Sequence, residues 1–198
     1  MPFPGYLVSV APLSREQFDS IEFDAAASGD HEAAAREMTL LARTGTATDG
    51  MPRAEAFLRA GEQWLLADEP AEAVADLRRA MADGGAVSAD PRVPLARALF
   101  QLGRQSEAQA LIRGVKVEGR LDPRTCDLVA ELLVERSDLP AALDWATAGV
   151  RLCLAAAERG QPSEGDESEL RLLLRLRYRI RNDLGLPEDD YDAMLDEA

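Results

Sequence analysis

The side chains that could do chemistry in this chain are few and scattered. His31 is the only histidine and follows a predicted helix N-cap at Asp30, so it is expected to be an exposed first-turn residue. The two cysteines, Cys126 and Cys153, are too few and too far apart for a zinc site or a secreted disulfide scaffold. No glycine-rich phosphate loop, Gly-x-Ser-x-Gly turn or paired metal-ligand spacing occurs. We therefore predict no catalytic residue, no metal site and no cofactor, and the chain is not expected to be an enzyme.

A second group is a run of arginines followed by an acidic tail. The arginines are Arg171, Arg175, Arg177, Arg179 and Arg181, and the acids are Asp189, Asp190, Asp192, Asp196 and Glu197. Arginines three and four positions apart share one face of a helix, where they could bind phosphate or a carboxylate-rich partner. The alternative, which we favour, is that they pair with the acidic tail and with carboxylates of the preceding helices.

The composition argues against several classes of partner. The chain has 36 acidic and 22 basic residues, a net charge of −14, and Lys116 is its only lysine. Nucleic acids and anionic membranes are recognised by clustered positive charge, so neither is an expected partner. No apolar run approaches the roughly 18 residues of a membrane-spanning helix, and prolines interrupt the apolar start of the chain, unlike a signal peptide. With so few cysteines, a reducing, cytoplasmic location is expected.

The length and the residue types favour a helical protein. Of the 198 residues, 46% are hydrophobic but only 5% are aromatic, and alanine supplies much of the apolar content. These residues suit closely packed helices better than β-strands. The length favours one domain with terminal additions over two full domains.

Small residues recur with one period along half of the chain. At the first recurring position they are Gly61, Ala96 and Ala130, and at the second Ala73, Ala108 and Ala142. Both sets are spaced by 35 and then 34 residues. A small residue in the middle of a helix lets a second helix approach closely, so this period predicts repeated helix pairs.

The segment Phe57-x2-Ala60-Gly61-x2-Trp64 and its later copies resemble the tetratricopeptide repeat, over roughly residues 53 to 150. The resemblance implies an all-α fold, an α-solenoid of antiparallel helix pairs wound into a right-handed superhelix. Asp90 and Asp122 are expected N-caps of two first helices, and Gly103 is expected at a left-handed helix end. Three residues depart from the family pattern: Arg92 and Cys126 replace aromatics, and Gly149 replaces alanine.

The repeats divide the chain into three parts. An extended segment is expected at 1–13, helical repeats at 14–160 and C-terminal capping helices at 166–198. Four copies are expected within the repeats, a degenerate one at 14–44 and clear ones at 52–83, 91–118 and 123–158. In the degenerate copy, Glu22 stands where a small residue is expected.

The resemblance also implies a concave groove lined by the first helix of each pair. The partner-binding residues that it implies are Leu58, Glu62, Leu66, Val93, Arg97, Phe100, Asp127 and Glu131. This mixture of apolar side chains and carboxylates suits a peptide segment of neutral or basic character. Phe100 is the best single anchor, because truncating a large aromatic contact often weakens binding strongly.

We therefore predict a non-catalytic protein-interaction module, an adaptor or regulator that holds another protein in its groove. One alternative is an enzyme or small-molecule binder in which the C-terminal helices close a pocket. Another is a structural protein that self-associates through its terminal helices.

Overall fold

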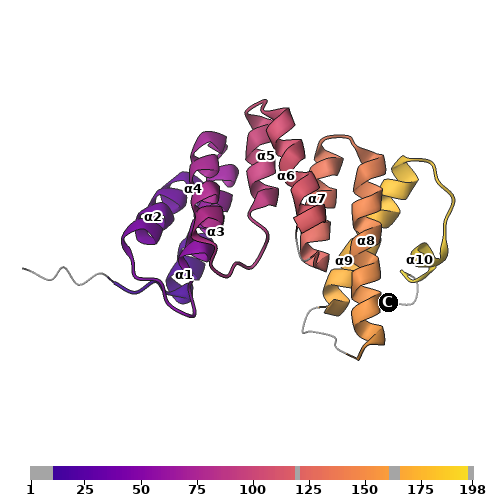
Figure 1. Ribbon diagram of the computed structural model, residues 1–198, viewed down its shortest axis with the longest axis horizontal. Coiled ribbons are helices and arrows are strands. Elements are labelled where there is room, and N and C mark those ends of the chain that lie inside the picture. Colours follow the sequence, from indigo (N-terminus) through magenta and orange to yellow (C-terminus); the bar gives the residue numbers. More distant parts are fainter. Residues whose placement is uncertain (1–10, 119–120, 161–165, 196–198) are drawn as a thin grey trace, which may run out of the picture. The chain divides into compact units, whose positions relative to one another are not determined.

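The computed structural model describes residues 11–118, 121–160 and 166–195, and every regular element in these ranges is a helix (Figure 1). The helices are α1 (Arg15–Ser28), α2 (His31–Thr44), α3 (Arg53–Leu66), α4 (Pro70–Asp83), α5 (Arg92–Gln101), α6 (Gln105–Glu118), α7 (Pro123–Glu135), α8 (Leu139–Glu158), α9 (Asp166–Asp183) and α10 (Asp190–Ala193). The prediction of an all-α protein is confirmed. The chain forms two compact units, Met1–Gln109 and Ala110–Ala198.

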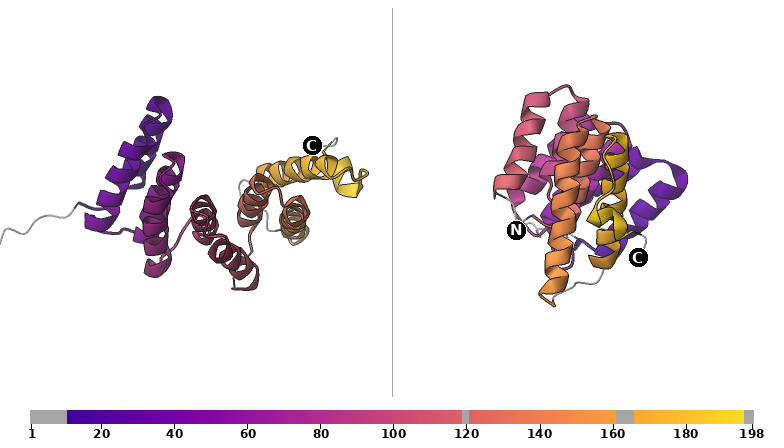
Figure 2. Two further views of the ribbon diagram at one scale, coloured as in Figure 1. Left: turned by 90° about the horizontal axis from the view of Figure 1, so that it is seen from above. Right: turned by 90° about the vertical axis from the view of Figure 1, so that its right-hand side faces the viewer.

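In the first unit, helices that follow one another in sequence pack against one another. Contacts join α1 to α2, α2 to α3, α3 to α4 and α4 to α5, and α3 also touches α5. Figure 2 shows α3 and α4 side by side in this succession. Of the predicted N-terminal segment 1–13, residues 1–10 lie outside the described residues, and Leu13 N donates to Thr46 O at 2.7 Å.

The second unit continues the same mode of packing. Contacts join α7 to α8 and α8 to α9, α7 also touches α9, and α10 touches α9. Val150, Cys153, Leu173 and Leu174 form a buried cluster between α8 and α9. The last predicted repeat, 123–158, corresponds to α7 and α8, and the predicted capping helices correspond to α9 and α10.

Three helix-to-helix turns have the same backbone hydrogen bonds at the predicted period. The second residue after each first helix adopts left-handed φ, at Asp68 (59°), Gly103 (73°) and Ser137 (61°). In each turn the next N–H donates to the carbonyl five residues earlier: Glu69 to Trp64, Arg104 to Leu99 and Asp138 to Leu133, at 2.8–2.9 Å. Such paired bonds satisfy the last carbonyls of a helix. The prediction for Gly103 is confirmed, and the turn geometry repeats with the small residues.

The predicted N-caps are present with one difference. Asp122 accepts a hydrogen bond from Thr125 N at 2.8 Å and starts α7. Asp90 lies one residue before the N-cap of α5, Pro91, and accepts from Arg92 N at 3.0 Å. Because proline has no N–H to be capped, the aspartate reaches the next free donor instead.

Glycines mark the closest helix crossings. A Cβ on Gly61 would lie 2.5 Å from Leu77 Cγ, so only glycine fits where α3 crosses α4. A Cβ on Gly149 would lie 2.8 Å from Leu173 Cδ2 and 3.0 Å from Cys126 Cβ. The departure from alanine at Gly149 is therefore explained by close contacts of α8 with α9 and α7.

No helix among the described residues is long and apolar enough to cross a membrane.

Candidate functional site

The predicted groove residues of the first unit differ in their accessibility. On α3, Leu58 is fully buried, Glu62 is half-buried and Leu66 is 61% exposed. Leu58 packs in the core, so in this structure it is not presented to a partner. Leu66, at the end of α3, offers the apolar surface that was expected there.

The predicted groove residues of α5 also differ in their accessibility. Val93 is 3% exposed and is a core residue, whereas Arg97 and Phe100 are half-buried. Arg97 and Phe100 both make further contacts within the chain. Phe100, predicted as an anchor for a partner, is thus partly core and partly surface.

The two predicted residues of α7 belong to the second unit and lie one helical turn apart. Asp127 is half-buried, and Glu131 is exposed. Burial, together with the nearby carboxylates Glu131 and Glu169, raises the pKa of Asp127 to about 6, against the opposing effect of Arg124. Glu169 comes from α9, so two helices contribute to this acidic face.

Asp127 is expected to make stability fall as pH rises from about 4 to about 6. Its folded pKa, about 6, lies above its ordinary value of 3.8, so the folded state holds a proton that the unfolded state releases in this window. Stability is therefore greatest below the window and is lost as pH rises through it, by about 1–2 kcal/mol after allowance for solvent screening.

Asp127→Asn removes the charge at every pH. Urea unfolding should show the variant more stable than the wild type at about pH 8, with the difference shrinking toward about pH 4. Asp144→Asn, an exposed change on α8, controls for net charge. A difference between Asp127→Asn and the wild type that does not change with pH would contradict the assignment.

Among the residues that the structure describes, the groups that could support catalysis do not come together in one site. Cys126 and Cys153 are buried free cysteines, and burial raises the pKa of the Cys126 thiol to about 12, which disfavours a nucleophilic thiolate. No group of histidine, cysteine or carboxylate side chains in the described ranges could hold a metal ion. Two depressions lie on the surface: one of about 440 Å³ lined by Thr48, Arg53 and Asp83, and a smaller one of about 200 Å³ between α1 and α2. Both are open to solvent.

His31 differs from the expected exposed residue. It is half-buried, and its Nδ1 lies 2.9 Å from Gln63 Oε1 on α3. Its expected N-cap is present, because Asp30 accepts a hydrogen bond from Ala33 N at 3.1 Å. The packing of α2 on α3 brings the first turn of α2 against a neighbour that the local sequence does not reveal.

The structure also shows an ion-pair cluster that the sequence did not predict. Arg59 on α3 is 7% exposed and donates to Glu22 Oε1 and Asp19 Oδ1 on α1, both at 2.7 Å, with its guanidinium 5.6 Å from the Phe18 ring. Glu22, which stands in place of a small residue, therefore pairs with a charge instead of fitting a close crossing. An arginine spaced among apolar residues on α3 was the only local signal.

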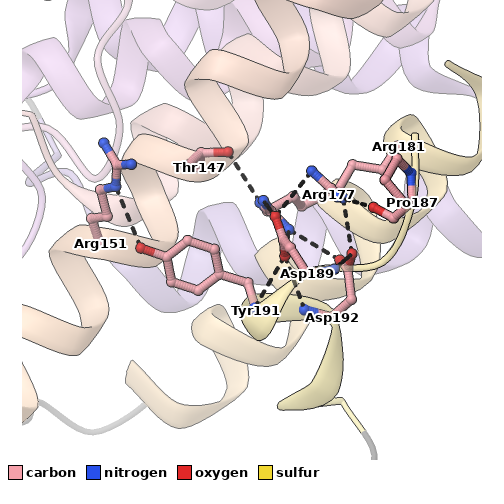
Figure 3. Close-up of polar contacts among 8 residues, drawn as sticks. All are labelled: Thr147, Arg151, Arg177, Arg181, Pro187, Asp189, Tyr191 and Asp192. Atoms are coloured by element: carbon pink, nitrogen blue, oxygen red, sulfur yellow. Dashed lines mark hydrogen bonds and ion pairs between the residues drawn. The ribbon is translucent and has the colours of Figure 1, made fainter.

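The C-terminal arginines follow the favoured interpretation in part. Arg177 and Arg181 pair with Asp189 and Asp192, and Arg171 pairs with Glu167 on its own helix (Figure 3 shows the first four residues). The hydrogen bond from Arg177 lowers the pKa of Asp189, although burial opposes it. This cluster ties α10 to α9.

Comparisons with protein-family models, curated proteins and solved structures found no significant match. The class of protein that the fold defines is an all-helical chain of sequentially packed helix pairs.

Proposed function

We propose that this chain is a non-catalytic protein-interaction module, an adaptor or regulator that binds a neutral or basic peptide segment of another protein. The observation that supports it best is the acidic face formed by Asp127, Glu131 and Glu169 on α7 and α9. Like charges gathered on a half-buried surface repel one another, and a basic side chain of a partner would relieve this repulsion.

We further propose that the helix pairs are tetratricopeptide-like repeats that build an α-solenoid. The left-handed turns at Asp68, Gly103 and Ser137 and the small residues on the first helices share one period, which supports the proposal. In such repeats the first helices line the binding face, and Asp127 and Glu131 lie on a first helix. Glu62, Leu66, Arg97 and Phe100 remain predicted contact residues within the first unit.

The proposal predicts charge-dependent peptide binding at α7. A panel of labelled peptides graded in net charge, measured by fluorescence anisotropy against the full chain, should bind more tightly as positive charge increases. Asp127→Asn with Glu131→Gln should weaken binding of the basic peptides about tenfold, because two complementary charges are lost.

Asp144→Asn with Glu158→Gln is the matched control, since it removes the same charge from exposed positions of α8. This control should bind as the wild type does. Equal weakening in both double variants would indicate general attraction to an acidic protein and would count against a site at α7, as would tighter binding of acidic peptides there.

A further inference from the structure

The segment Leu186–Leu195 folds back onto α8 and α9 through two kinds of contact. Two of its carboxylates reach the same pair of arginines: Arg177 Nη1 lies 2.9 Å from Asp189 Oδ1 and 3.0 Å from Asp192 Oδ1, and Arg181 Nε lies 2.8 Å from Asp192 Oδ2 (Figure 3). Arg181 Nη1 also lies 3.0 Å from Asp189 Oδ2. The acids three positions apart thus face arginines four positions apart.

The apolar side chains of the segment make the second kind of contact. Tyr191, Met194 and Leu195 pack against the buried cluster of Val150, Cys153, Leu173 and Leu174. The Tyr191 ring also lies under Arg177, with the guanidinium carbon 4.8 Å from its centroid. The segment therefore matches the surface with two acids, an aromatic ring and two apolar side chains.

The surface beneath the segment is built by contacts that do not involve it. The helices α8 and α9 pack on each other and on α7. Arg177 is oriented from the other side as well, because its Nε donates to Thr147 Oγ1 on α8 at 3.1 Å. Arg177 is thus held in place independently of the segment.

Beyond these contacts, two further hydrogen bonds hold the segment among the described residues, from Arg181 Nη2 to Pro187 O and from Leu186 N to Arg181 O. Helix α10 has only four residues, too few to be stable alone, and the connection through Leu186, Pro187 and Glu188 is exposed. Of the residues of α10, only Asp192 is buried. A short, largely exposed segment of this kind opens at a lower free energy than the packed helices do.

The surface also has a positively charged side chain with which the segment makes only a weak hydrogen bond. Arg151 on α8 is exposed, and its polar contact among the described residues is a long hydrogen bond, 3.4 Å from Nε to the Tyr191 hydroxyl oxygen (Figure 3). A ligand with a carboxylate at this place would gain an interaction that the chain's own segment does not make.

We propose that the face of α8 and α9 around Thr147, Arg151, Arg177 and Arg181 is a docking site for a short acidic segment of a partner protein, and that Leu186–Leu195 of this chain occupies it as a competing internal ligand. The partner segment carries two acids three positions apart, an aromatic residue between them and aliphatic residues after them. This site is separate from the acidic face of α7 and has the opposite charge, so it selects a different class of partner. The two proposals are therefore independent, and failure of one test does not contradict the other proposal.

The test uses a labelled peptide with the sequence of Leu186–Leu195 as the probe and the full-length chain as the receptor. Asp189→Asn with Asp192→Asn should release the internal segment, because the arginines lose both ion-pair partners. The variant should then bind the probe at least about tenfold more tightly than the wild type does. The reason is that the state in which Leu186–Leu195 has left the surface, and the probe can bind, becomes the main one. Adding Arg177→Met should abolish this gain.

Two controls make the outcome specific. Asp183→Asn with Asp190→Asn removes two charges from exposed positions beside the cluster and should leave probe binding as in the wild type. A probe with asparagine in place of Asp189 and Asp192 should bind neither the wild type nor the released variant. Circular dichroism reports whether the variants are folded, and Tyr191→Ala provides a second way to release the segment if the aspartate variant is not.

Three results would overturn the proposal: no binding of the probe to either released variant, equal binding to the wild type and the released variant, or binding that survives Arg177→Met. Sedimentation addresses the other possible occupant, the same segment of a second copy. Concentration-dependent dimerisation of the wild type that the probe dissociates would assign the site to self-association and would overturn the partner assignment.

Discussion

Replacing Trp64 with alanine is expected to lower the free energy of unfolding by about 3–5 kcal/mol. The indole on α3 is 6% exposed, and its Nε1 donates to Thr39 Oγ1 on α2 at 3.1 Å and to Asp76 Oδ2 on α4 at 3.2 Å. Asp76 is 1% exposed and also accepts from Thr39 and Arg79. The substitution opens a cavity and removes one donor from a buried carboxylate. Urea unfolding followed by circular dichroism measures the loss.

Phenylalanine separates the two contributions. Trp64→Phe keeps most of the packing but removes the donor, so it should lower stability by about 1–3 kcal/mol. Trp145 on α8 is equally buried and makes no hydrogen bond among the described residues, so Trp145→Phe should cause only the packing loss. Equal losses for the two substitutions would mean that the bond to Asp76 contributes nothing.

Replacing Gly61 with leucine is expected to lower the free energy of unfolding by about 3 kcal/mol. Already a Cβ there would lie within 2.7 Å of two Leu77 side-chain atoms, and Leu77 is fully buried. A larger side chain must push α3 and α4 apart, although leucine is by itself a better helix former than glycine by up to about 1 kcal/mol. Thermal and urea unfolding should both report the loss.

Gly50→Leu is the matched control, because a Cβ at Gly50 meets only Thr48 Oγ1 at 4.0 Å. That variant should change stability by less than about 0.5 kcal/mol. If Gly61→Leu were equally mild, α3 and α4 would not be in the close register described here.

The helix pairs could be predicted from the sequence because their determinants are local. Gly61 lies at the close crossing of α3 and α4, and Ala96 and Ala130, which recur at the same spacing, are fully buried. The turns follow the same period, since the left-handed residue and the hydrogen bond that closes it involve only neighbours in sequence. The bounds predicted for the last repeat, 123–158, match the start of α7 and the end of α8.

The surface of each helix was predicted less well, because burial depends on every neighbour that a helix touches. Leu58 and Val93 were expected in a groove and are core residues, since α3 and α5 also contact each other and not only α4. Glu22 was taken as a poor substitute for a small residue, but Arg59 on α3 pairs with it. His31 is covered in the same way by Gln63.

The sequence by itself determined the class of the protein, the repeat length, the acidic character of the surface and the supply of arginines at the C-terminus. Only the tertiary structure decided which charges meet. The pKa of Asp127 is raised partly by Glu169, which lies on another helix. Of the five C-terminal arginines, Arg177 and Arg181 pair with α10 because the chain turns back and places α10 beside this part of α9. Helical periodicity is a property of neighbouring residues, whereas electrostatic and packing energies depend on distances between helices, which are known only once the chain is folded.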